Sequence, residues 1–153
     1  MQHNIAEEYG ICSLPPIKVF TDSNKNGIVT NKLLNEFSQK IIFTISDNVN
    51  TLNFIAEYFR NTKNEYSILH LDAKSRMKEN HSSESVIRNL TINKIDITQV
   101  GIRSLSKDEE NYKKENLVKQ FLACEINLGM YGNDWQELVV RNLKQNVLIV
   151  LNI

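Results

Sequence analysis

The stretch SILHLDAKSR, residues 67 to 76, carries the side chains with the clearest capacity for chemistry. An apolar run ends at an acid, Asp72, and two cations follow at alternate positions, Lys74 and Arg76. In open α/β sheets, ligands bind outside the carboxyl ends of the strands, so an acid there is a candidate metal ligand or catalytic carboxylate. The two cations oppose this interpretation, because they would compete with a metal ion for the carboxylate.

Three further polar residues are expected at the same edge of a sheet. Asp47 and Arg103 each follow an apolar, strand-like run, and Asn152 lies at the end of the last one. In a parallel sheet these residues could form a cluster with Asp72. For each of them taken alone, we favour a structural role.

The apolar pattern predicts the elements that would position these residues. Strands are expected at 17–20, 40–45, 66–72, 95–102 and 146–153, and helices at 30–39, 49–60, 83–91, 106–116 and 134–143. Residues 118–132 fit neither type clearly. The alternation predicts an α/β fold with three αβα layers and a mostly parallel sheet. We expect residues 1–153 to form one domain, with an irregular segment over 1–30.

Several local patterns refine this prediction. The run 66–72 is apolar on both faces except at His70, which is typical of a parallel strand covered on both sides. We expect His70 to be a core residue hydrogen-bonded to a neighbour. Ser106 and Glu109 have the spacing of a helix capping box. The run 146–153 is expected to be a last buried strand whose edge could pair with another chain.

Composition excludes several classes of function. The 18 Lys and Arg residues balance the 18 Asp and Glu residues, which gives no electrostatic case for binding nucleic acid or an anionic membrane. No apolar run is long enough to span a bilayer. The N-terminus lacks a signal-peptide pattern, and two cysteines do not form a disulfide framework, so we expect a cytoplasmic protein. We expect Cys124 to be a small apolar core residue.

The alternative metal sites are weak. Residues 22–27, DSNKNG, imitate the start of a calcium-binding loop, but Leu33 stands where that loop needs a closing Glu. We interpret the segment as a polar turn. The three histidines are scattered, without a second His or Cys at ligand spacing.

Taken in order, the strand ends resemble those of the ureohydrolase superfamily, which includes agmatinase, arginase and formimidoylglutamase, with agmatinase the most similar. The segment TQVGIRSLSKDEENY, residues 98–112, is similar to the family pattern V-Q-V-G-I-R-S-x-S-x-E-E. The stretch DAKSR, residues 72–76, resembles the family motif D-A-H-x-D. The resemblance covers residues 31–153 and implies an arginase-like fold that is truncated relative to the family. It also implies two manganese ions that activate a water for attack on a guanidinium carbon.

In this resemblance most of the metal-site positions are altered. The histidine of the family motif G-G-D-H falls on Asn48, although the acid before it is kept as Asp47. The first acid of the motif S-x-D-x-D falls on Asn152. A histidine in a family loop that handles substrate falls on Ser83.

The motif D-A-H-x-D is altered in the same way. Its first acid is kept as Asp72, its histidine falls on Lys74 and its second acid falls on Arg76. An ammonium and a guanidinium beside a dication would oppose metal binding. One hypothesis is that the Lys74 ammonium replaces a metal charge and pairs with Asp72 or Asp47. The alternative is that Lys74 and Arg76 point into solvent.

The sequence therefore predicts a degenerate agmatinase- or arginase-like homologue with no cofactor, no catalytic residue and no guanidino hydrolysis. The chain is expected to be either an evolutionary remnant or a non-catalytic partner, and its expected partners are further copies of itself or an active ureohydrolase subunit. Two alternatives stay open. One is a hydrolase converting agmatine to putrescine and urea, with residual activity or activity completed by another chain. The other is a module that binds a small ligand or a protein in the strand-end cleft.

Overall fold

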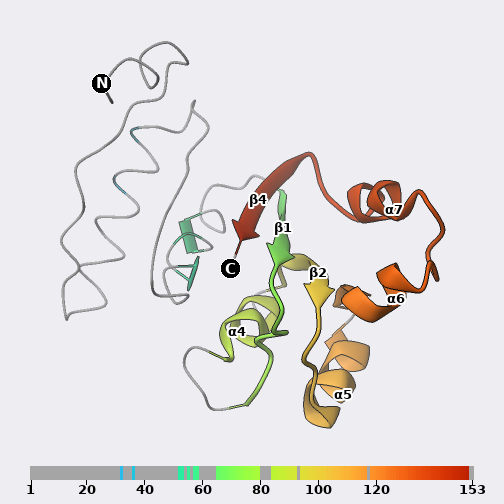
Figure 1. The fold of residues 1–153 in the computed structure, drawn as a ribbon. Coiled ribbons are helices and arrows are strands. Elements are labelled where there is room, and N and C mark those ends of the chain that lie inside the picture. Colours follow the sequence, from blue (N-terminus) through green and yellow to red (C-terminus); the bar gives the residue numbers. More distant parts are fainter. Residues whose placement is uncertain are drawn as a thin grey trace, which may run out of the picture.

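The computed structural model of the chain describes residues 32, 36, 52, 53, 55, 57, 58, 65–79, 84–92, 94–116 and 118–151, in which strands and helices alternate (Figure 1). The elements in chain order are β1 (Tyr66–Leu71), α4 (Val86–Ile92), β2 (Asp96–Ile102), α5 (Lys107–Asn116), β3 (Lys119–Leu122), α6 (Ala123–Asn127), α7 (Trp135–Arg141) and β4 (Asn146–Leu151). At least one helix separates each strand from the next, as the apolar pattern predicts.

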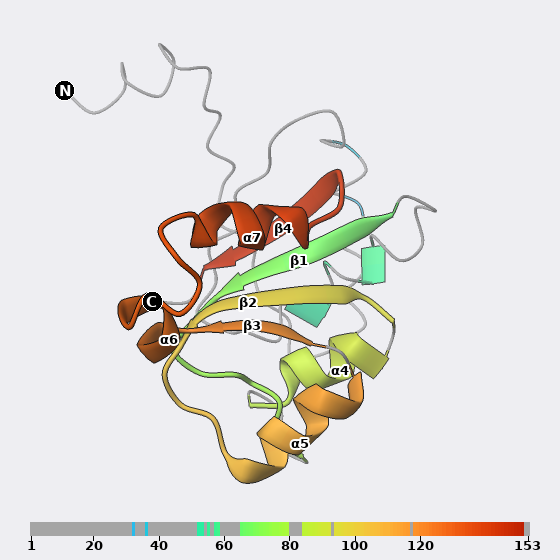
Figure 2. The same cartoon turned by 90° about the vertical axis from the view of Figure 1, so that its right-hand side faces the viewer.

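The strands form a parallel sheet in the order β3-β2-β1-β4 within the described part of the chain. The register places Ile68 of β1 opposite Ile97 of β2 and Leu148 of β4. Helices α4 and α5 lie on one side of the sheet and α7 lies on the other (Figure 2). This arrangement confirms the predicted three-layer αβα fold with a parallel sheet.

Two apolar clusters hold the layers together. On one face, Ile68 packs with Val86, Ile87 and Leu90 of α4 and with Tyr112 of α5. On the other face, the cluster joins strands β1, β2 and β3 to α6 and α7; its buried members are Val100, Phe121 and Val139. Because a strand sends alternate side chains to opposite faces, the central strand β1 contributes to both clusters.

The last strand differs from its prediction. β4 lies at one side of the described sheet, and the expectation that it is buried is wrong. Leu148 and Val150 pack on the core, whereas Val147, Ile149 and Leu151 on the opposite face are 38%, 63% and 64% exposed. A uniformly apolar run does not reveal which faces of a strand are covered by helices, and the described members of the cluster formed with α6 and α7 include no residue of β4.

Most predicted helices begin and end close to the observed bounds. Helices α4, α5 and α7 match the predicted segments 83–91, 106–116 and 134–143. The undecided segment 118–132 contains β3 and α6. Described residues of the first two predicted helices are helical, and Leu52 and Ile55 are buried as expected. The strands predicted at 17–20 and 40–45 lie outside the described residues.

Two surface features complete the fold. Cys124 is exposed on α6 rather than buried, because Ile126 is the residue of that short helix that packs on the sheet. Among the described residues, no helix is both long enough and apolar enough to cross a membrane.

The apolar layer around Ile68 sets the stability of this fold. Ile68 is fully buried, so Ile68→Ala should lower the free energy of unfolding by about 3 kcal/mol through lost transfer energy and a cavity. Ile149→Ala, on the neighbouring strand but 63% exposed, is the matched control and should cost well under half as much. Urea unfolding followed by circular dichroism measures both. Equal losses would contradict the assigned faces of the sheet.

Candidate functional site

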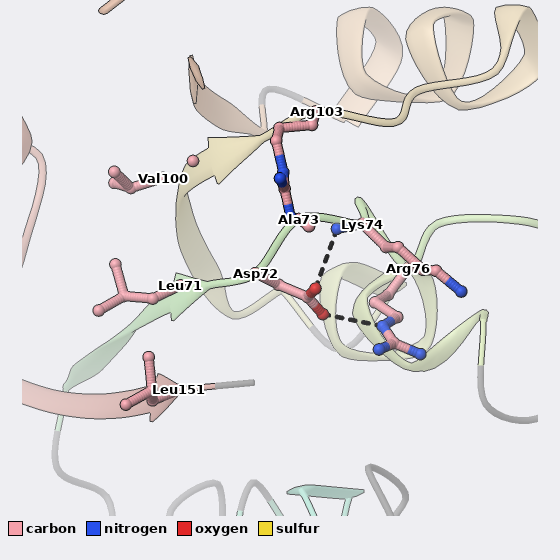
Figure 3. Close-up of a pocket in the computed structure, with 9 residues that line it drawn as sticks. Leu71, Asp72, Ala73, Lys74, Arg76, Val100, Arg103 and Leu151 are labelled. Atoms are coloured by element: carbon pink, nitrogen blue, oxygen red, sulfur yellow. Dashed lines mark hydrogen bonds and ion pairs between the residues drawn. The ribbon is translucent and has the colours of Figure 1, made fainter. Parts of the chain in front are cut away.

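A pocket lies where β1, β2 and β4 end at the carboxyl edge of the sheet (Figure 3). Its volume is about 480 Å³. The described residues that line it are Leu71, Asp72, Ala73, Lys74, Arg76, Val100, Gly101, Arg103 and Leu151. The pocket therefore brings together four of the charged residues that the sequence places at or just after strand ends.

Asp72 has both carboxylate oxygens engaged. Oδ1 accepts a hydrogen bond of 2.9 Å from the backbone N–H of Lys74. Oδ2 accepts one of 2.9 Å from Nε of Arg76, and the two side chains, 5% and 15% exposed, form an ion pair. The charge of Asp72 is thus compensated by a guanidinium four residues along the chain.

Lys74 does not pair with Asp72 through its ammonium group. Its Nζ lies 3.8 Å from Oε1 of Glu84, its side chain is 57% exposed, and Figure 3 shows that side chain extending away from the Asp72 carboxylate. The hypothesis of a Lys74–Asp72 pair is therefore wrong. Pairing of Lys74 with Asp47 lies outside the described residues.

Arg76 supplies the cation from a turn with an unusual backbone conformation. Its φ of 57° is in the left-handed region, which non-glycine residues rarely adopt and which costs about 1 kcal/mol. The turn helps place the guanidinium beside Asp72. The alternative in which both cations point into solvent is correct for Lys74 and wrong for Arg76.

A row of buried polar side chains crosses the sheet behind Asp72. His70, Gln99 and Gln120 are paired in register on β1, β2 and β3. Nε2 of Gln99 donates to the Ser75 carbonyl over 2.7 Å and lies 3.0 Å from Nδ1 of His70, while Oε1 of Gln99 accepts from Gln120 over 2.7 Å. The prediction that His70 is a hydrogen-bonded core residue is confirmed.

This row fixes the tautomer of His70. Because the amide nitrogen of Gln99 donates to a carbonyl, it must also donate to Nδ1, so a neutral His70 carries its proton on Nε2. Nε2 lies 3.4 Å from Oδ2 of Asp72. The histidine thus presents an N–H to the carboxylate at a distance too long for a strong hydrogen bond.

Glu109 anchors the loop that carries Asp72 and Arg76. It is 3% exposed and accepts hydrogen bonds from the Ser75 hydroxyl and, over 3.1 Å, from the N–H of Met77. Its other oxygen accepts from the N–H and hydroxyl of Ser106, each over 2.9 Å. The N–H of Glu109 donates back to the Ser106 hydroxyl, which confirms the predicted capping box.

The charge of Glu109 is stabilised in spite of its burial. Burial is the largest single influence and raises the pKa of this carboxyl. The hydrogen bonds from Ser75, Met77 and Ser106 together outweigh it, so the pKa lies below its ordinary value. Sequence reasoning identified Glu109 only as a cap and did not assign its bonds to Ser75 and Met77.

The remaining predicted site positions are not described. Asp47, Asn48, Ser83 and Asn152 all lie outside the described residues. Sequence reasoning also missed Gln99 as part of the site. The available signal was a polar residue in the middle of an apolar strand, like His70.

The described positions do not fit a dimanganese centre. No group of three or more His, Cys, Asp or Glu side chains in the described ranges could hold a metal ion. Asp72 already accepts from two donors, one of them a guanidinium, and Lys74 and Arg76 offer no lone pair to a metal.

No family model matches the chain, and no curated protein matches it in sequence. Solved structures do match its fold. Formimidoylglutamase from Bacillus subtilis is 18% identical with a TM-score of 0.75, and the match covers 91% of this chain and 49% of that one. Proclavaminate amidino hydrolase from Streptomyces clavuligerus is 17% identical with a TM-score of 0.67, and the match covers 86% of this chain and 47% of that one. The arginase from Helicobacter pylori is 16% identical with a TM-score of 0.57, and the match covers 88% of this chain and 59% of that one.

These likenesses show the fold of the chain. It is the arginase-like α/β fold that the strand-end motifs predicted, and the resemblance to ureohydrolases is confirmed at that level. The chain spans about half the length of the two solved structures with the higher TM-scores.

The two cations that follow Asp72 should differ in their effect on stability. Arg76→Gln removes a cationic partner of a buried carboxylate and should lower the free energy of unfolding by about 3 kcal/mol. Lys74→Gln, the matched control in the same loop, should change it by less than about 0.5 kcal/mol, since its ion pair is largely exposed. Chemical denaturation of both variants tests this, and a larger loss for Lys74→Gln would restore the Lys74 hypothesis.

Glu109 should make stability depend on pH. Its pKa in the folded chain lies below its ordinary value of 4.5, so the stability it contributes is present above pH 4.5 and is lost as the pH falls through the lower, folded value. Glu109→Gln should be less stable by about 2 kcal/mol at neutral pH and should lose part of that acid dependence. Thermal unfolding of the wild type and of Glu109→Gln from pH 7 to pH 3 measures this pH dependence. Glu115→Gln, exposed on the same helix, should keep the wild-type profile.

Proposed function

We propose that this chain is an arginase-like protein that does not hold the dimanganese centre and does not hydrolyse guanidino compounds. The observation that carries the proposal is the engagement of Asp72 by Arg76. A metal ion bound to Asp72 would lie within about 4 Å of the guanidinium. At an effective dielectric of about 20, each unit of its charge would be repelled by roughly 4 kcal/mol.

The neighbouring positions support the same proposal. The turn at Arg76 places a cation on the carboxylate, and Lys74 adds a second positive charge to the pocket wall. Asn48 and Asn152 stand where the resemblance expects an imidazole and a carboxylate, and a neutral amide is a poorer ligand than either. Among its relatives we propose agmatinase as the most similar in ancestry, on the motif residues 98–112.

A role as a non-catalytic partner is the second part of the proposal. The exposed apolar face of β4, formed by Val147, Ile149 and Leu151, offers a surface that another subunit could cover, either a copy of this chain or an active ureohydrolase. The competing function, agmatine hydrolysis completed by residues of another chain, uses the same surface. A cytoplasmic location suits the free thiol of Cys124.

Metal analysis and a hydrolysis assay test the proposal. The chain, purified after growth with added manganese, should contain no manganese above background, and added manganese should not raise its melting temperature. It should release no urea from agmatine or arginine above the uncatalysed rate, with an active arginase as the positive control. Two manganese ions per chain, together with urea release, would overturn the proposal.

A double variant sharpens the same experiment. Lys74→His with Arg76→Asp recreates the ligand types of the D-A-H-x-D motif in this loop. Manganese should raise the melting temperature of this variant and leave that of the wild type unchanged. An equal rise in both proteins would show that Arg76 does not exclude the metal.

A further inference from the structure

We propose that the strand-end pocket binds a small organic carboxylate with a short apolar stem, held by Arg103, with Lys74 adding positive charge at the pocket rim. This inference rests on the proposed function in one respect, because it requires that no metal ion occupies this edge. It assigns the pocket a ligand of opposite charge to a guanidinium.

The charges that line the pocket favour an anion. Asp72 is its one described acid, and Arg76 compensates that carboxylate at 2.9 Å. Nζ of Lys74 lies 3.8 Å from Oε1 of Glu84, and the Lys74 side chain is 57% exposed. Within the described ranges, no acidic side chain forms an ion pair with Arg103, which is exposed. The described part of the lining therefore carries an excess of positive charge.

The backbone holds the two cationic segments side by side. The carbonyl of Ala73 accepts from the N–H groups of Arg103 and Ser104, over 2.8 Å and 3.0 Å. Lys74 and Ser104 also form a parallel bridge. The loops after β1 and β2 are thereby fixed to each other, so the ligand would not have to order them on binding.

The rest of the lining suits an apolar stem. Leu71, Val100 and Leu151 come from three different strands and line the pocket opposite the charged loop (Figure 3). Gly101, with a φ of 83°, lies where the register between β2 and β3 shifts. A volume of about 480 Å³ is within the ordinary range of small-molecule sites, and apolar walls with a few convergent polar groups are typical of them.

The chemistry of the cations selects a carboxylate. A guanidinium offers paired N–H donors that match the two oxygens of a carboxylate, and an ammonium adds a point charge. An alkylammonium of the same length would meet the same apolar wall and be repelled by both groups. Two ligands of the same shape and opposite charge should therefore differ in their affinity for the pocket.

Matched probes of opposite charge test this inference on the whole chain. Hexanoate and hexylamine are titrated into the ¹⁵N-labelled protein in EDTA at low salt, with amide resonances of the loops after β1 and β2 as the readout. Hexanoate should shift these resonances saturably, hexylamine should not, and added salt should weaken hexanoate binding. Arg103→Gln should weaken it roughly tenfold, whereas Arg141→Gln, an exposed arginine on α7, should not change it.

The outcomes distinguish a loss of ligand binding from unfolding of the variant and from failure of the proposed function. Lys74→Gln provides a second variant, with a smaller loss expected, should Arg103→Gln unfold. Equal binding of hexylamine, equal effects of Arg103→Gln and Arg141→Gln, or binding of inorganic phosphate as tight as that of hexanoate would overturn the inference. Manganese uptake is measured separately. If the chain takes up manganese, the proposed function is contradicted. If it binds neither manganese nor hexanoate, only this inference is contradicted.

Discussion

The carboxylate of Asp72 is the constraint around which this end of the molecule is arranged. It ends the central strand, is 8% exposed, and would be unstable there without a compensating charge or donors. The chain supplies both from the following turn, through the N–H of Lys74 and the guanidinium of Arg76. The left-handed backbone at Arg76 is the conformational cost of that arrangement, and the ion pair offsets it.

The same loop is tied to a second buried carboxylate through Ser75. The Ser75 hydroxyl donates to Glu109 and its carbonyl accepts from Gln99, which in turn donates to His70 beside Asp72. A continuous polar path therefore joins the N-terminus of α5 to the end of β1 through the sheet. The bonds from Ser75 and Met77 to Glu109 tie this loop to the N-terminus of α5. Further along the path, Nε2 of His70 and Oε1 of Gln120 are buried without a hydrogen-bond partner among the described residues.

The sequence predicted those features that depend on local patterns. The runs forming β1 and β2, the apolar stripe of α4 and the Ser106–Glu109 box all follow from spacing along the chain, and they are found where expected. It failed where the outcome depends on how elements pack in the folded chain. The exposure of one face of β4 follows from the lack of packing, within the described residues, between that face and the α6–α7 cluster, which an apolar run does not encode. The choice between Lys74 and Arg76 as the partner of Asp72 depends on the local geometry of the turn, which composition cannot specify.

The outer face of β4 has a consequence for how the protein behaves in bulk. Three branched apolar side chains, at 147, 149 and 151, project from a single strand into water with exposures of 38% to 64%. A contiguous apolar stripe of this kind favours association through the face of the strand rather than through its hydrogen-bonding edge. The balanced net charge of the chain offers little electrostatic repulsion against that association.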